Sequence, residues 1–218
     1  MLIPIIIGVT GHRDLREKDI LELRELVRVE LQKLKINYPH SPLVMLNSLA
    51  VGADLLCAEE ALKLNITLKC PIPMQLDEYR NDFNNDTLVR FDAIITIAKQ
   101  VFVVPNNISE KTKKNRDYYY RQAGIYIAMH SHILLALWDG TPAKENGCGT
   151  AEVVDFMLGE EYDGHIKAIN EGIVIHINTP RKSSNSELKI TTRLIENRNN
   201  ALSDSLQMID DFNKYTRL

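Results

Sequence analysis

Short apolar runs alternate with amphipathic segments along most of this chain. Six runs have the length of strands buried on both faces, and they occupy residues 3–9, 43–50, 66–74, 101–105, 132–138 and 172–180. The segments between them repeat apolar residues every three or four positions, which predicts helices near 18–34, 52–62, 86–98, 117–129 and 150–158. Strands that alternate with helices form βαβ units. The pattern therefore predicts an α/β fold, with a doubly wound, mostly parallel sheet of about six strands and helices on both faces.

The end of the chain, residues 181–218, follows a different pattern. Residues 181–190 are polar and rich in serine, which predicts a linker after an α/β domain at 1–180. An amphipathic helix is expected from about Ile195 to Tyr215, and the residues predicted to share one side of it are Leu202, Leu206, Ile209 and Phe212. Such a helix most often packs on its own domain. Otherwise it pairs with a second copy in a homo-oligomer, or leads to a further effector domain or partner.

Composition and charge narrow the class of protein. The chain of 218 residues is 44% hydrophobic and 25% charged, as soluble globular proteins are, and its net charge of −3 gives no reason to expect nucleic acid as a partner. No apolar run is long enough for a membrane segment, and the N-terminus is expected to be a first strand and not a signal peptide. Cys57, Cys70 and Cys148 are widely spaced and form no metal or redox motif, which favours a reduced, cytoplasmic setting.

The stretch 132–156 carries the strongest chemical signal. A buried strand ends at Asp139-Gly140, and a turn with Gly147, Gly149 and Thr150 then leads into a helix. Backbone N–H groups and the helix dipole favour an anion at such a helix start, and glycine lets a phosphate approach the backbone. Gly149 is then expected to need either a positive φ or close contact with the ligand. The alternative is an ordinary strand-to-helix turn.

Three strand-to-helix junctions, at 8–14, 47–54 and 139–152, are rich in small residues. In a doubly wound sheet, ligands bind at the carboxyl ends of the strands, where all three junctions can meet. The predicted ligand-binding residues are Thr10, Gly11, His12, Arg13, Ser48, Gly52, Asp54, Asp139, Gly140, Gly147, Gly149 and Thr150. The alternatives are that Arg13 is a solvated charge, that His12 caps its turn and that Asp54 only stabilises a helix dipole.

Other motifs point away from common cofactors. No junction matches GxGxxG or GxxxxGK[ST], so a dehydrogenase and a P-loop NTPase are disfavoured, and no cofactor is expected. His130 and His132 have no carboxylate or cysteine in register, so they are interpreted as structural and no metal site is predicted. Of the residues that precede the 132–138 strand, a tyrosine among 118–120 can stack on a base and Arg121 can hold a phosphate.

The motifs GVTGHRD, SLAVGADLLCAEEAL, SHILLALWDG and GCGTAEVV, spread over residues 3–180, resemble the SLOG superfamily. This superfamily comprises the Rossmann-like domains of Lonely Guy (LOG) enzymes, DprA-type proteins and bacterial nucleotide-sensing modules. The resemblance implies a Rossmann-like fold and a nucleotide or nucleotide-derived ligand at the strand carboxyl ends. The GGxGT turn of the family corresponds to residues 146–150.

The resemblance departs from the enzymes at their catalytic residues. Lonely Guy phosphoribohydrolases carry PGGxGTxxE, whose glutamate position is Val153 here. Glu152 comes one residue early, about 100° around a helix. The arginine–lysine pair of the family is also not reproduced, because Gln122 follows Arg121.

Three hypotheses follow. The first is a sensor module for a nucleotide, NAD-like or ADP-ribose-like ligand, in bacterial signalling or defence. The second is an N-glycosidase or phosphoribohydrolase acting on nucleoside monophosphates, with Glu152 and Arg121 as catalytic residues and Asp155 as a substitute for Glu152. The third is an assembly module whose pocket is vestigial.

Overall fold

The protein is described here from a computed structural model, which covers residues 2–105, 115–143, 149–159, 172–184, 189–196 and 201–216. The strands are β1 (Ile5–Gly11), β2 (Leu43–Leu46), β3 (Thr67–Ile72), β4 (Gln100–Val103), β5 (Ile133–Trp138), β6 (Ile173–Asn178) and β7 (Thr192–Glu196). The α-helices are α1 (Ile20–Asn37), α2 (Ala53–Lys63), α3 (Leu76–Tyr79), α4 (Asn85–Ile97), α5 (Arg116–Met129), α6 (Thr150–Met157) and α7 (Ala201–Thr216). Two 3₁₀ turns lie at Glu17–Asp19 and Arg80–Asp82.

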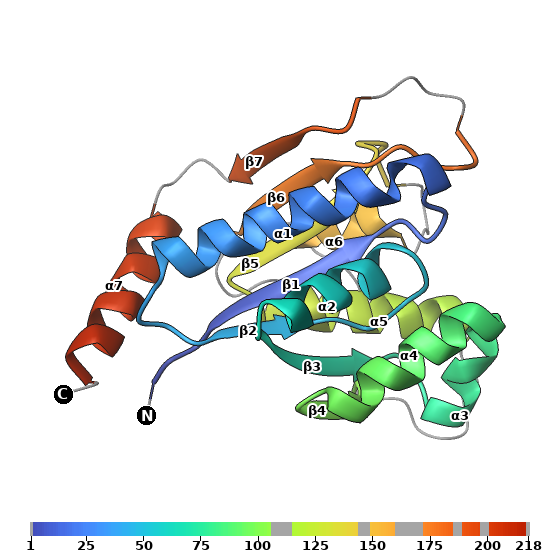
Figure 1. Cartoon of the computed structure of the whole chain (residues 1–218), viewed down its shortest axis with the longest axis horizontal. Helices are drawn as coiled ribbons and strands as arrows, with labels where there is room; N and C mark the ends of the chain where they lie inside the picture. Colours follow the sequence, from blue (N-terminus) through green and yellow to red (C-terminus); the bar gives the residue numbers. More distant parts are fainter. Residues whose placement is uncertain are drawn as a thin grey trace.

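The strands form one sheet in the order β4-β3-β2-β1-β5-β6-β7 (Figure 1). Every pair is parallel except β6 and β7, which are antiparallel. The six predicted strands correspond to β1–β6, and the predicted α/β class and Rossmann-like, doubly wound arrangement are confirmed. In the described part of the chain, no helix is both long enough and apolar enough to cross a membrane.

Two hydrophobic cores lie on opposite faces of the sheet. Residues such as Ile5, Ile7 and Leu135 point to the face covered by α1, α2 and α4, while Leu134 and Ala136 point to the face covered by α5 and α6. Successive strand residues point to opposite faces, so β5 is buried at every position and its sequence is apolar throughout.

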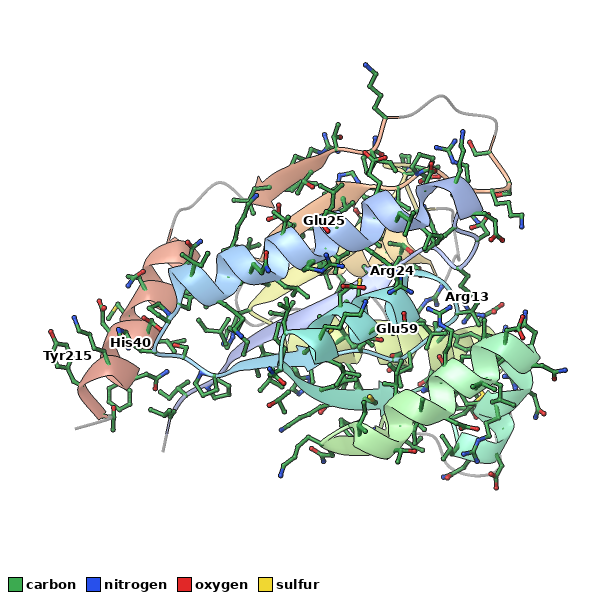
Figure 2. The ribbon with its side chains drawn as sticks, viewed as in Figure 1. Arg13, Arg24, Glu25, His40, Glu59 and Tyr215 are labelled. Atoms are coloured by element: carbon green, nitrogen blue, oxygen red, sulfur yellow. The ribbon has the colours of Figure 1, made fainter. Side chains whose placement is uncertain are left out.

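An ion-pair network joins the helices on the first face. The carboxylate of Glu60 on α2 is fully buried and accepts hydrogen bonds from Arg24 (2.8 Å), Arg28 (3.1 Å) and Lys63 (2.7 Å). Glu59 pairs with Arg24 and with Arg90 of α4, so one cluster of charges links three helices (Figure 2). These contacts fix α2, whose first turn lies at the carboxyl ends of the strands.

The chain beyond residue 180 differs from the prediction. Ile195, expected to begin the last helix, lies in β7, and α7 begins only at Ala201. β7 is an edge strand with Leu194 57% exposed, so it lacks the apolar run that marks the buried strands. Phe212 is predicted to share one side of this helix with Leu206, but it is 52% exposed, whereas Leu206, Asp210 and Asn213 are buried. The side chain of Leu202, also predicted on that side, lies outside the described part.

Candidate functional site

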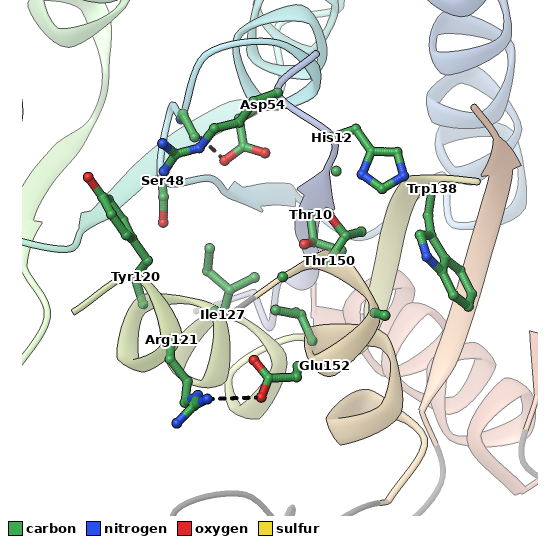
Figure 3. Close-up of a pocket in the computed structure, with 18 of the residues that line it drawn as sticks. Thr10, His12, Ser48, Asp54, Tyr120, Arg121, Ile127, Trp138, Thr150 and Glu152 are labelled. Carbon is green, nitrogen blue, oxygen red and sulfur yellow. Dashed lines mark hydrogen bonds and ion pairs between the residues drawn. The ribbon is translucent and has the colours of Figure 1, made fainter. Parts of the chain in front are cut away.

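The strand order of this sheet reverses between β1 and β5. From β1 the chain proceeds outward through β2, β3 and β4 on one side, and then returns to place β5 on the other side of β1. This reversal is the topological switch point, where the loops after neighbouring strands diverge and leave a crevice. A cleft of about 430 Å³ occupies this position, and its walls come from the loops after β1, β2 and β5 and from α5 and α6 (Figure 3).

The first two junctions are held together by close backbone contacts. The N–H of His12 donates to the carbonyl of Leu137 (3.0 Å), and the N–H of Ala53 donates to the carbonyl of His12 (3.0 Å). A Cβ on Gly11 would lie 2.4 Å from that of Ala53. A Cβ on Gly52, whose φ is +93°, would lie 2.5 Å from the carbonyl oxygen of Arg13. Both glycines therefore let the start of α2 pack against the turn after β1.

His12 and Asp139 join the first junction to the third. The backbone N–H of Asp139 donates to Nε2 of His12 (3.0 Å), and the Asp139 carboxylate lies 3.2 Å from the same nitrogen. Burial lowers the pKa of His12 and outweighs the opposing effect of Asp139. A neutral imidazole with its proton on Nδ1 satisfies the backbone hydrogen bond, so we interpret the contact with the carboxylate as a neighbouring charge and not as an ion pair.

Arg13 and Tyr120 form one wall of the cleft. The Arg13 guanidinium carbon lies 4.6 Å from the centroid of the Tyr120 ring, a cation–π distance. The Tyr120 hydroxyl donates a hydrogen bond to Asp82, which also accepts one from Arg116. These contacts fix the orientation of the Tyr120 ring. Tyr120 thereby positions Arg13 at the cleft, and Asp82 and Arg116 hold Tyr120 in place.

Asp54 is a buried carboxylate that lines the cleft close to Arg13, with 6% of its surface exposed. Its Oδ2 accepts the backbone N–H of Ala50 (3.3 Å). Burial raises the pKa of Asp54 to about 7, against the opposing effects of that hydrogen bond and of Arg13. A carboxyl group that changes protonation state near neutral pH inside a cleft is typical of functional sites.

The third junction ends at the N-terminus of α6. Gly149 is the N-cap residue and, as a glycine, has no side chain to accept a capping hydrogen bond. Thr150 and Glu152, both largely buried, line the cleft beside it. Nη2 of Arg121 on α5 lies 3.2 Å from Oε1 of Glu152, which Figure 3 shows as a dashed line. Backbone N–H groups, a cation and a carboxylate therefore meet on this wall.

Gly149 itself has an extended backbone, with φ −121°, and a Cβ on it would meet no atom within 4 Å. The first of the two expected reasons for glycine here, a positive φ, is therefore wrong. Close contact with a ligand stays a prediction.

The structure brings most of the predicted residues into this one cleft. Those that line it are Thr10, Gly11, His12, Arg13, Ser48, Asp54, Arg121, Asp139, Gly149, Thr150 and Glu152. Gly52 and Gly140 are not among the lining residues. Gly52 packs against the backbone of His12 and Arg13, which do line the cleft, and Gly140 follows β5 with φ +81°. Gly147 lies outside the described residues, as does the start of the turn at 146–148.

Several lining residues were not predicted. Tyr79 lies in a segment that is polar in sequence, yet its ring is buried between Phe83 and Phe91 and its hydroxyl donates to the Ser48 carbonyl (3.0 Å). Trp138, the last residue of β5, and Arg181, after β6, also reach the cleft. Arg181 pairs with Asp14 (2.9 Å) across 167 positions of sequence, a contact that no local pattern indicates.

The two histidines interpreted as structural make backbone contacts. Nδ1 of His132 accepts the N–H of Ile6 (2.9 Å), and Nδ1 of His130 lies 2.8 Å from the Tyr126 carbonyl. Across the described ranges, no group of three or more potential metal ligands comes together.

Comparison with known proteins finds similarity to several solved structures, among them the following three. No model of a protein family matches the chain, and no curated protein matches it. DNA processing protein A (DprA) from Streptococcus pneumoniae is 15% identical with a TM-score of 0.44, over 70% of this chain and 47% of that protein. DprA from Helicobacter pylori, described with a single-stranded DNA binding mode, is 14% identical with a TM-score of 0.48, over 98% of this chain and 80% of that protein.

The third structure is the Moco carrier protein of Chlamydomonas rheinhardtii. It is 15% identical with a TM-score of 0.37, over 72% of this chain and 70% of that protein. The present chain thus spans about half the length of the Streptococcus protein. DprA-type domains are among those that the sequence motifs resemble. At these identities and TM-scores the comparisons carry no inference about ligand or activity.

Proposed function

We propose that this chain is a binding module for a nucleotide or a nucleotide-derived ligand such as NAD or ADP-ribose. The observation that carries the proposal is the meeting of three strand-to-helix junctions in one cleft at the topological switch point. The phosphate would lie against the first N–H groups of α6, next to Gly149 and Thr150. The guanidinium of Arg13, which Tyr120 positions, would donate two hydrogen bonds to a second pair of phosphate oxygens or to the sugar.

A thermal-shift screen tests this proposal. The panel contains nucleoside monophosphates, cyclic nucleotides, NAD, ADP-ribose and a single-stranded oligonucleotide. The oligonucleotide is included because the Helicobacter protein is described as binding such DNA, although the charge of this chain gives no reason to expect it. A ligand at 100 times its Kd should add about 2.7 kcal/mol to stability. If no nucleotide at millimolar concentration raises the melting temperature, the proposal fails.

Substitution of Gly149 tests where the phosphate binds, because a side chain at this position meets no protein atom within 4 Å. Gly149→Val should abolish ligand binding while the melting temperature without ligand stays that of wild type, and Gly149→Ala should have an intermediate effect. Thr150→Ala should weaken binding less, by about 0.5–1.5 kcal/mol, because it removes one hydroxyl. Titration calorimetry measures the affinities. Unchanged binding by Gly149→Val would place the phosphate elsewhere, with the turn at Gly11–Arg13 as the next candidate.

A second candidate function is hydrolysis of the N-glycosidic bond of a nucleoside monophosphate. What favours it is that Glu152 reaches the cleft and pairs with Arg121, although it stands one residue before the family position. Water would add to C1′ of the ribose while the C–N bond electrons and a proton leave with the base. Glu152 would stabilise the sugar cation or take the proton of water, and Arg121 would position the phosphate.

This alternative is tested by chromatography of nucleotides incubated with the protein. Enzymatic activity would release free base with wild type and not with Glu152→Gln, while Glu22→Gln, an exposed glutamate on α1, serves as the matched control. Binding without any release of base would leave the sensor as the function. Release that persists undiminished in Glu152→Gln would remove Glu152 from the proposed mechanism.

A further inference from the structure

Helix α7 is attached to the amino edge of the sheet by polar contacts. Oδ1 of Asp210 accepts hydrogen bonds from the His40 N–H and the Ser41 hydroxyl, each at 2.8 Å. The Asn213 side chain exchanges two hydrogen bonds with the backbone of Ile3, at 2.8 and 2.7 Å. Asp210 and Asn213 are buried together with Leu206. The helix is therefore held in one orientation by its inner side.

The outer side of α7 carries large apolar side chains. Met208 is 71% exposed, Phe212 52% and Tyr215 70%, and their spacing of four and then three residues aligns them in one stripe. At about 100° per residue, this stripe lies roughly 200° around the helix from Leu206. Figure 2 places Tyr215 at the outer end of the molecule. Other exposed large apolar residues of the described helices, such as Leu21 and Val89, are single.

The charges beside the stripe indicate what covers it. Asp211 and Lys214 are exposed and lie on the same flank of the stripe. When two identical helices pack antiparallel, equal flanks face each other, so Asp211 of one copy meets Lys214 of the other, twice by symmetry. The same arrangement places Phe212 against Phe212 and Met208 against Tyr215. A parallel pair would not bring these opposite charges together.

We propose that α7 is a homodimerisation surface, on which the stripe of Met208, Phe212 and Tyr215 packs antiparallel against the α7 stripe of a second copy of this chain. Three apolar side chains per copy form a small interface, so the dimer is concentration dependent. The attachment points of α7, at Ile3 and at His40-Ser41, adjoin the amino ends of β1 and β2. Figure 1 shows α7 at the end of the molecule where β1 begins. The cleft lies at the carboxyl ends of the strands, so the pairing leaves both clefts open.

Sedimentation velocity of the full chain between about 1 μM and 1 mM, the range in which weak interfaces associate, tests the proposal. Wild type should pass from monomer to dimer, and Phe212→Glu should raise the dimer dissociation constant at least about tenfold because it buries a charge in the stripe. Leu21→Glu, which alters an 82% exposed apolar residue at the start of α1, should leave the dimer dissociation constant unchanged. A wild type that stays monomeric throughout, or a Phe212→Glu variant that associates as wild type does, overturns the proposal.

Charge reversal tests the antiparallel orientation. Asp211→Lys and Lys214→Asp should each weaken the dimer, since each places like charges together, and the double variant should restore it. Single variants that weaken association without rescue in the double variant overturn the antiparallel pairing. Circular dichroism and melting temperatures of each variant establish that α7 and the domain remain folded.

Discussion

At the scale of single residues, the fold changes the protonation of Asp54 in the range around neutral pH. Its carboxyl is buried in the cleft wall, and its pKa is raised from 3.8 to about 7. The folded state therefore holds a proton that the unfolded state releases between about pH 4 and 7. The contribution of Asp54 to stability is fully present below the unfolded pKa and is lost as the pH rises through the folded pKa.

Replacement of Asp54 by asparagine should remove this pH dependence. The asparagine side chain retains an oxygen for the Ala50 N–H and never ionises, so Asp54→Asn should be more stable than wild type at pH 8, by on the order of 4 kcal/mol. The difference should disappear near pH 4. Urea unfolding at pH 4, 6 and 8 measures it. A stability difference that does not grow with pH would show that Asp54 is ionised in the folded protein throughout.

At the scale of elements, the site depends on how closely the turn after β1 approaches the start of α2. Gly52 combines φ +93° with a Cβ position 2.5 Å from the Arg13 carbonyl oxygen and 2.6 Å from that of His12. Neither atom can move without displacing the backbone that carries two cleft residues. Helix α2 is in turn fixed by the Glu60 ion pairs to α1.

Gly52→Ala should therefore destabilise the protein by about 1–3 kcal/mol, because the added methyl group meets backbone at a strained φ. Gly149→Ala is the matched control, because φ there is −121° and the Cβ position is open, and it should leave stability within about 0.5 kcal/mol of wild type. Denaturant midpoints of the two variants measure the contrast. Equal midpoints would mean that the turn and α2 can separate without loss of stability.

At the scale of the whole molecule, the cleft and the α7 stripe lie at opposite edges of the sheet. Thr10 and Thr150 belong to the carboxyl edge, whereas α7 is attached at Ile3 and Ser41 near the amino edge. Binding and dimerisation should then be separable. Phe212→Glu should bind any ligand found in the screen with the affinity of wild type, measured by titration calorimetry below and above the dimer dissociation constant. A ligand affinity that rises with dimer formation would instead reveal coupling between the two edges.

The sequence by itself determined the elements of the doubly wound sheet and the junctions that form the cleft. A strand buried on both faces must be apolar throughout, and a helix start packed closely against a turn favours small residues, so β1–β6, Gly11 and Gly52 leave local signals. The same local reasoning predicted that Arg13, Asp54 and Thr150 would share one edge, since carboxyl ends of parallel strands meet there.

Only the tertiary structure decided the contacts made between distant segments. β7 has little apolar pattern because one face is exposed and its pairing with β6 is a backbone contact, which any side chain permits. Tyr79 reaches the cleft through aromatic packing. Arg181 reaches it through an ion pair with Asp14, which is 167 positions away in the sequence. The orientation of α7 depends on contacts such as the hydrogen bond between Asp210 and Ser41, which are separated by 169 positions. Periodicity encodes which face of an element is apolar, but a buried polar side chain such as Asp210 is satisfied only by a partner that folding brings to it.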